Sequence, residues 1–214
     1  MPSPVLIIPW MALGMLSGSV LGFMTRSLLR AKPFSRLSWT MSATLTGLLF
    51  AVLAWRLGCG LALLAYSYVA AVLVPLSIVD WAEQRLPSMV VLPSYLVLGV
   101  AFGADAVLEY DYVNLLRSAA SMVILALAYL SLALATGGLG AGDVKLAGLL
   151  GLTLGWWSWS ALFTGTFLSW LFAATARVVL RSTGRVERDD PMPLGPYLAL
   201  GTMVTVVLGL STSS

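Results

Sequence analysis

The chain has 214 residues, of which 59% are hydrophobic and 10% are charged, and its mean hydropathy is +0.94. This composition excludes a soluble globular domain and predicts an all-α fold, a polytopic transmembrane helical bundle. The formal net charge of +3 fits basic loops that contact membrane lipid, and it requires no nucleic acid partner.

Eight apolar stretches are candidates for helices that cross the bilayer. In chain order they cover about residues 4–25, 38–55, 59–79, 89–107, 116–136, 146–157, 158–176 and 196–210. The first is expected to stay in the protein, because the residues before it carry no positive charge of the kind that precedes a cleavable signal peptide. The loops between the stretches are short, so we expect residues 1–214 to form a single transmembrane domain of about eight helices.

Lysine and arginine residues in short loops mark the cytoplasmic side of a membrane protein. With the N-terminus outside, ten of the twelve basic residues fall on the cytoplasmic side, and only Arg56 and Arg117 fall outside. This orientation places the loops after Asp80, around Asp143 and at 181–195 on the cytoplasmic face. Three segments that are far apart in the sequence are therefore predicted to share one face.

The sequence contains no histidine and a single cysteine, Cys59. Catalytic pairs of serine or cysteine with histidine, the HExxH zinc site and a thiolate zinc site are therefore excluded. Two aspartates stand at the edges of apolar stretches, Asp80 at the end of the third and Asp143 in the polar gap after the fifth. An acid so close to hydrocarbon indicates a function. Two adjacent carboxyl groups can share a proton, so one can activate a water molecule while the other protonates the leaving group, without metal or cofactor.

Glycines surround the second acid. Gly140 and Gly142 can adopt backbone conformations closed to other residues, and they allow another peptide to approach Asp143 closely. The apolar pattern resumes at Leu146, so Asp143 is expected near a helix N-terminus. A tight turn with an aspartate N-cap explains the same residues without any catalytic role. These residues alone leave both interpretations open.

Four segments resemble type IV prepilin peptidases, and they follow the order found in that family. Residues 138–146 (GLGAGDVKL) are similar to its GxGD segment, and residues 80–87 (DWAEQRLP) resemble the segment that bears its first catalytic aspartate. Residues 193–199 (PLGPYLA) resemble its C-terminal Pro-Phe-Gly-Pro element, and residues 14–22 (GMLSGSVLG) resemble its opening helix. Four ordered matches are much more specific than a GxGD motif alone.

The resemblance implies a multi-pass aspartic endopeptidase of the bacterial plasma (inner) membrane, with its active site facing the cytoplasm. Such an enzyme removes the basic leader from prepilins or pseudopilins by cutting after a glycine. Asp80 and Asp143 would be the catalytic pair, with no metal and no cofactor. Residues expected to contact the substrate are Gly140, Gly142, Lys145, Pro193, Gly195 and Pro196. For Lys145, an ammonium group that reaches the lipid headgroups is an equally good interpretation.

The loop between the first two helices departs from the pattern of bifunctional family members. Those members insert a longer cytoplasmic domain there, often with paired cysteines for zinc, and this domain is linked to N-methylation of the mature pilin. This chain has only the short loop 26–37, without a cysteine. We therefore expect peptidase activity without methyltransferase activity, and no site for S-adenosylmethionine.

Other classes of protein also place acids in a membrane. The presenilin-like branch of GxGD proteases would have Tyr-Asp at the first acid, where this chain has Val79-Asp80. A catalytically silent relative would use the acid pair to brace helices, and a proton-coupled transporter would use it to carry protons. A transporter more naturally places its acids near the midplane. The positions of Asp80 and Asp143 at helix ends therefore favour proteolysis.

Overall fold

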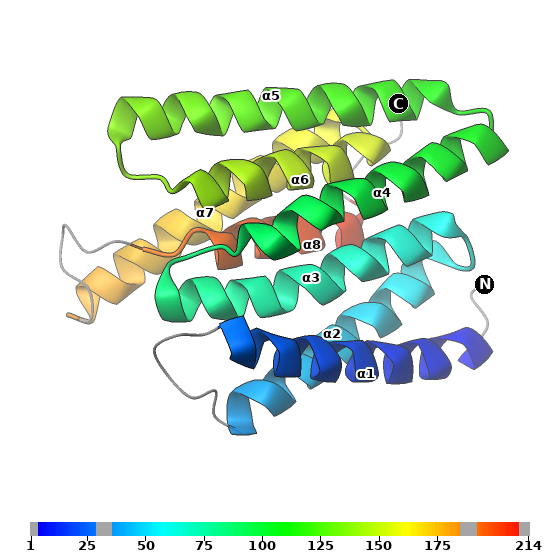
Figure 1. Cartoon of the computed structure of the whole chain (residues 1–214), viewed down its shortest axis with the longest axis horizontal. Coiled ribbons are helices and arrows are strands. Elements are labelled where there is room, and N and C mark those ends of the chain that lie inside the picture. The colour runs from blue at the N-terminus through cyan, green and yellow to red at the C-terminus, as the bar shows by residue number, and fades with distance from the viewer. Residues whose placement is uncertain (1–3, 29–35, 185–191, 210–214) are drawn as a thin grey trace.

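The computed structural model describes residues 4–28, 36–184 and 192–209, and all regular structure in these residues is α-helical. Eight helices follow one another along the chain (Figure 1): α1 (Pro4–Leu28), α2 (Arg36–Leu57), α3 (Leu61–Glu83), α4 (Ser88–Leu108), α5 (Tyr112–Thr136), α6 (Ala141–Trp157), α7 (Trp159–Ser182) and α8 (Gly195–Leu208). The predicted all-α bundle of about eight helices is confirmed.

The helices run back and forth along the long axis of the bundle (Figure 1). One end of the bundle therefore holds the α3–α4 and α5–α6 connections and the start of α8. The other end holds the α2–α3 and α4–α5 connections. Helices α1 to α5 and α7 are long and apolar enough to cross a membrane, whereas α6 and α8 are shorter. The chain is thus a multi-pass helical membrane protein.

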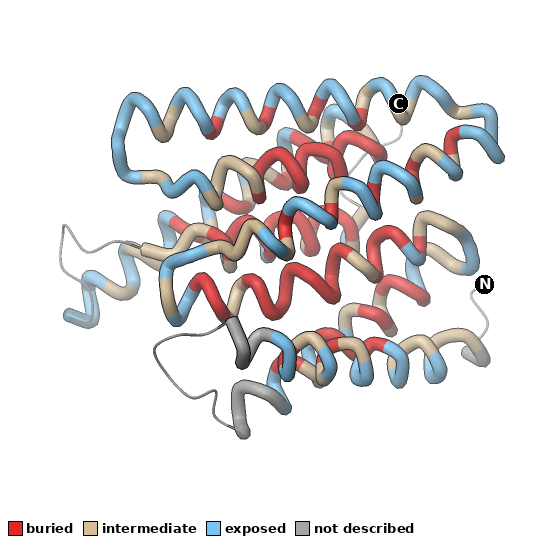
Figure 2. Tube along the Cα trace, viewed as in Figure 1, coloured by how far each residue is buried: buried red, intermediate tan, exposed pale blue. Residues whose placement is uncertain are grey.

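Burial separates the central helices from the outer ones (Figure 2). In the membrane-spanning part of α3, 72% of the residues are buried, against 17% in α1 and in α5. Every residue of α6 from Leu146 to Trp156 is also buried. The outer helices expose leucine, valine and phenylalanine side chains, as expected where lipid replaces water around a protein. The two helices that carry Asp80 and Asp143 are therefore interior elements.

Two helix ends differ from the predicted positions. Helix α6 begins at Ala141, more than one turn before the predicted start at 146, because the Asp143 carboxylate accepts a hydrogen bond from Gly140 N (3.1 Å). This contact stabilises the first turn, since the initial N–H groups of a helix lack partners within it. Helix α3 continues through Asp80 to Glu83, so this acid lies in the last helical turn.

Small residues allow α5 and α6 to pack at short range. A Cβ atom built on Gly151 would lie 2.5 Å from the carbonyl oxygen of Ser121 and 3.0 Å from the Cα of Met122. A Cβ on Gly155 would lie 3.0 Å from the Cα of Ser118. Backbone atoms cannot move aside as a flexible side chain can, so these positions exclude larger residues.

We expect Gly151→Ala to lower the free energy of unfolding by about 1–3 kcal/mol, the usual cost of inserting a methyl group into a packed interior. Thermal unfolding in detergent measures the effect as a lower Tm. Gly99→Ala is the matched control, because nothing lies within 4 Å of a Cβ at Gly99. A Gly151→Ala protein as stable as the Gly99→Ala protein would contradict the close α5–α6 contact.

Candidate active site

Asp80 is a buried acid whose position is fixed by the start of α8. The residue is only 4% exposed, and its Oδ2 accepts a hydrogen bond from the backbone N–H of Gly195 at 2.8 Å. A Cβ on Gly195 would lie 2.8 Å from the same oxygen. Only glycine permits this close approach. The Pro193–Pro196 element, predicted as a substrate contact, therefore also holds the first acid.

Asp143 reaches the same region from α6. Its carboxylate is half-buried and closes the first turn of its own helix through Gly140. Asp80 and Asp143 are near enough to interact electrostatically, although they make no hydrogen bond to each other. The structure thus brings together two acids that are far apart in the sequence.

The loop that follows α3 packs against the start of α6. A Cβ on Gly142 would lie 2.8 Å from the Cβ of Leu86. Gly142 therefore allows the α6 start to contact this loop, while Gly140 is exposed beside it. The two glycines thus have different surroundings, although the sequence analysis predicted the same role, a substrate contact, for both.

Lys145 makes hydrogen bonds to α4 through both its side chain and its backbone. Its Nζ donates a hydrogen bond to Ser88 Oγ at 2.8 Å, and its carbonyl oxygen accepts one from Tyr95 Oη at 2.5 Å. Ser88 and Tyr95 belong to α4, so these bonds hold the start of α6 against the start of α4. Lys145 therefore connects α6 to α4 in this structure.

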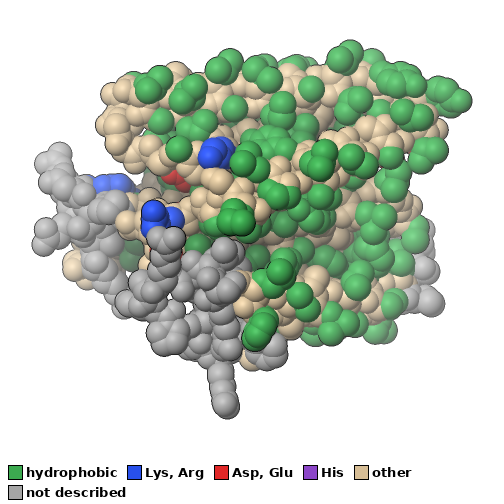
Figure 3. All heavy atoms as spheres, viewed as in Figure 1, with side chains coloured by type: hydrophobic (Ala, Val, Ile, Leu, Met, Phe, Trp, Pro, Cys, Tyr) green, Lys and Arg blue, Asp and Glu red, His purple; other side chains and the backbone are tan. Residues whose placement is uncertain are grey.

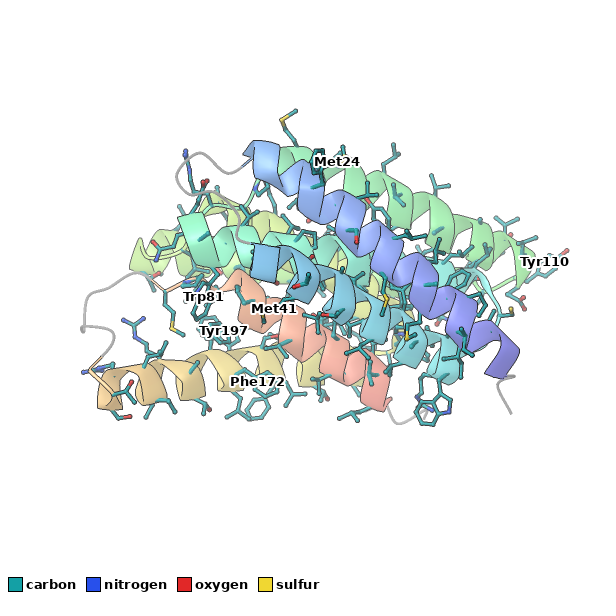
Figure 4. All side chains as sticks on the ribbon, turned by 90° about the horizontal axis from the view of Figure 1, so that it is seen from below. Met24, Met41, Trp81, Tyr110, Phe172 and Tyr197 are labelled. Atoms are coloured by element: carbon teal, nitrogen blue, oxygen red, sulfur yellow. The ribbon has the colours of Figure 1, made fainter. Side chains whose placement is uncertain are left out.

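The proline element before α8 is only partly buried. Pro193 lies in the non-helical segment 192–194, and Pro196 is in the first turn of α8, where a missing N–H is tolerated. Next to it, Tyr197 packs edge-on against Trp81, with 6.5 Å between ring centroids (Figure 4). Trp81 directly follows Asp80 and is 56% exposed. The indole therefore forms part of the surface beside the buried acid.

The surface around this end combines charge with apolar area. In Figure 3 the acidic surface lies close to Lys and Arg side chains at one end of the bundle, while hydrophobic side chains cover most of the remaining face. An apolar cavity of about 320 Å³ lies between α1, α3 and α4, and Val79 and Pro87 are among the residues that line it. The cavity therefore begins one residue from Asp80 along α3.

Some predicted positions fall outside the described residues. They are most of the 26–37 loop and the charged residues 185–190 of the α7–α8 connection. Three contacts were not foreseen from sequence: the bond from Gly195 to Asp80, and the bonds of Lys145 with Ser88 and Tyr95. A tyrosine and a serine in an apolar stretch gave no pattern that could have indicated the latter two.

Comparison with known proteins places these residues in a family. Residues 67–178, more than half of the chain, match the model of the type IV leader peptidase family. This match includes both Asp80 and Asp143. No solved structure matches the chain significantly.

Similar proteins include three named prepilin leader peptidase/N-methyltransferase. The Pseudomonas putida protein is 34% identical over 171 residues, which are 76% of this chain and 56% of that protein. The Bacillus subtilis protein is 29% identical over 169 residues (79% and 65%), and the Pseudomonas aeruginosa protein is 31% identical over 169 residues (77% and 56%). The chain spans about 56–65% of the length of these relatives. From the family match and these similarities, the chain belongs to the type IV leader peptidase family.

Proposed function

We propose that this protein is a membrane aspartic endopeptidase that removes the basic leader from prepilins or pseudopilins, cutting after a glycine at the cytoplasmic membrane face. One observation carries the proposal: Asp80 from α3 and Asp143 from α6 come within electrostatic range at one end of the bundle. Membership of the leader peptidase family supports the same function.

The two acids can perform hydrolysis as a general acid and a general base. One carboxylate takes a proton from a water molecule, which attacks the carbonyl carbon of the scissile peptide. The protonated partner donates to the developing oxyanion, and a proton then moves to the leaving amine. The Gly195 N–H already binds one oxygen of Asp80, which leaves its other oxygen for the reaction. Asp143 has one oxygen bonded to Gly140 in the same way.

The location of the acids suits a substrate with an apolar stem in the bilayer and a basic leader in water. Asp80 lies in the last turn of α3 and Asp143 in the first turn of α6, so both are near the bundle end and away from its middle. A proton-coupled transporter more naturally places its acids near the midplane. The apolar cavity between α1, α3 and α4, which Val79 helps to line, offers hydrocarbon-like surface for a substrate stem.

The experiment is cleavage of a prepilin encoded in the same genome by the purified, full-length protein in detergent, followed by mass spectrometry. We expect loss of the leader with a single new N-terminus after a glycine, and no cleavage when that glycine is replaced by valine. Added S-adenosylmethionine is expected to leave the mature product unmethylated, because the 26–37 loop is short and lacks cysteine. Failure to cut any prepilin or pseudopilin of that genome would overturn the proposal.

The orientation has a separate test. We expect a cysteine at Ser182, an exposed residue at the end of α7, to be labelled by a membrane-impermeant maleimide only in inverted vesicles. Cys59 is exposed at the opposite end of the bundle and is expected to react in intact cells. It therefore serves as the internal control in wild-type protein and is replaced by serine in the Ser182→Cys protein. Labelling of position 182 in intact cells would contradict the cytoplasmic location of the acids.

A further inference from the structure

Trp81 is a large exposed side chain beside a buried candidate acid. It directly follows Asp80 in the last turn of α3, and it is 56% exposed whereas Asp80 is 4% exposed. Tryptophan is common where a helix leaves the bilayer, so exposure alone would indicate only a membrane anchor. Two further observations relate this indole to the site: the element that holds it, and the side of α3 on which it lies.

The element that holds the indole also holds the acid. Trp81 packs edge-on against Tyr197, with 6.5 Å between the ring centroids (Figure 4). Tyr197 is only 7% exposed and lies two residues after Gly195, whose N–H binds Asp80 Oδ2 at 2.8 Å. The first turn of α8 therefore fixes the acid and the indole relative to each other.

Trp81 points away from the apolar cavity. Successive side chains along an α-helix are rotated by about 100°, because one turn has about 3.6 residues. Val79 lines the cavity between α1, α3 and α4. Val79 and Trp81 therefore project about 200° apart around α3, with Asp80 between them. A substrate whose stem lies in the cavity and whose scissile peptide lies at Asp80 thus brings its leader to the Trp81 side.

An exposed indole is a suitable partner for a basic leader. A lysine or arginine side chain is attracted to the face of an aromatic ring, and tryptophan is the best of these rings. Of the described residues, the acids at this end of the bundle are Asp80, Glu83 and Asp143. Asp80 and Asp143 form the proposed catalytic pair, and Glu83 already interacts with another group of the protein. The indole can hold a cation without placing a further carboxylate beside the pair.

We propose that the indole of Trp81 binds, by a cation–π contact, the basic leader side chain that is nearest to the scissile glycine. The inference rests on the proposed peptidase function and deepens it, because it names a residue that recognises the charge of the leader. The contact forms when the substrate binds and lies outside the bonds that are made and broken. It therefore contributes to substrate binding and not to the chemical step.

Trp81→Leu is the direct test, because it keeps an apolar side chain beside Tyr197 and removes the aromatic face. Cleavage of a prepilin by the purified, full-length protein is expected to show a KM raised about 3- to 30-fold, the range for one cation–π contact, and an unchanged kcat. Trp81→Phe keeps a weaker aromatic face, so we expect its KM to lie between those of wild type and Trp81→Leu. The Tm is expected to stay near that of wild type, because the side chain is exposed.

The second half of the test changes the substrate. Replacing the basic leader residue nearest to the glycine by glutamine removes its charge, and with the wild-type enzyme we expect this to raise the KM by a similar factor. Trp81→Leu is then expected to cause no further rise, because the effects of two groups in contact are not additive. Neutralising a basic residue further from the glycine is the substrate control, for which we expect the two effects to add.

Trp55→Leu is the matched control in the protein. Trp55 is 59% exposed, and it lies near the end of α2, at the opposite end of the bundle from the two acids. We expect the KM and kcat of this variant to equal those of wild type for every leader.

The outcomes separate the inference from the function on which it rests. Wild type that cuts no prepilin overturns the peptidase function, and this inference with it. If wild type cuts and Trp81→Leu has the same KM, the inference alone is wrong. A KM raised equally for charged and neutralised leaders would assign the indole to an apolar contact or a membrane anchor, and a lower Tm together with lower kcat would assign it to the fold. Either of these results also overturns the cation–π contact.

Discussion

Replacing Asp80 or Asp143 by asparagine is expected to slow leader cleavage by about 10²–10⁴-fold, the usual contribution of a general acid or base. Asparagine has nearly the same size as aspartate, and its amide oxygen can still accept the N–H of Gly195 or Gly140. The amide cannot act as a general acid or base, so the lower cleavage rate reports a loss of catalysis and not of folding. Rates are measured on purified variants with equal Tm.

Asp105→Asn provides the control for this pair of substitutions. Asp105 lies near the end of α4, at the opposite end of the bundle from the two acids. We expect this variant to cut at the wild-type rate. Full activity of either Asp80→Asn or Asp143→Asn would show that the residue is not part of the catalytic pair.

Gly195→Ala is expected to reduce kcat by about 10²-fold, because small displacements of a catalytic group have effects of this size. The added Cβ would lie 2.8 Å from Asp80 Oδ2 and 3.2 Å from its Cγ. Aspartate has a short side chain, so the carboxylate must move away or the start of α8 must shift. In both cases the bond from Gly195 N weakens and Asp80 leaves its position opposite Asp143.

Gly103→Ala is the matched control for Gly195→Ala, because both insert one methyl group into a helix. Nothing lies within 4 Å of a Cβ at Gly103, and alanine is a better helix former than glycine. We expect wild-type activity and equal or higher stability for Gly103→Ala. Equal activity of the Gly195→Ala protein would contradict the role of Gly195 in holding Asp80.

The number and order of the helices followed from the sequence, because hydrocarbon admits few other backbone structures and long apolar stretches are easily recognised. The helix ends were harder to predict. Helix α6 starts before Leu146 because Asp143, a polar residue that suggested a gap, caps its first turn. Hydropathy alone does not distinguish a polar cap inside a helix from a loop.

The candidate acids were also found from sequence, since isolated aspartates at membrane boundaries are rare. Their surroundings were not. The bond between Gly195 and Asp80 joins residues 115 positions apart, and no local pattern encodes such a contact.

The most direct test of the catalytic pair is the cleavage rate of wild type, Asp80→Asn, Asp143→Asn and the double variant on one prepilin under one set of conditions. Residues that act as a unit have non-additive effects. If the two acids share one reaction, the double variant retains the same residual rate as each single variant. A double variant whose loss equals the product of the two single losses would contradict a shared site and show that the acids act independently.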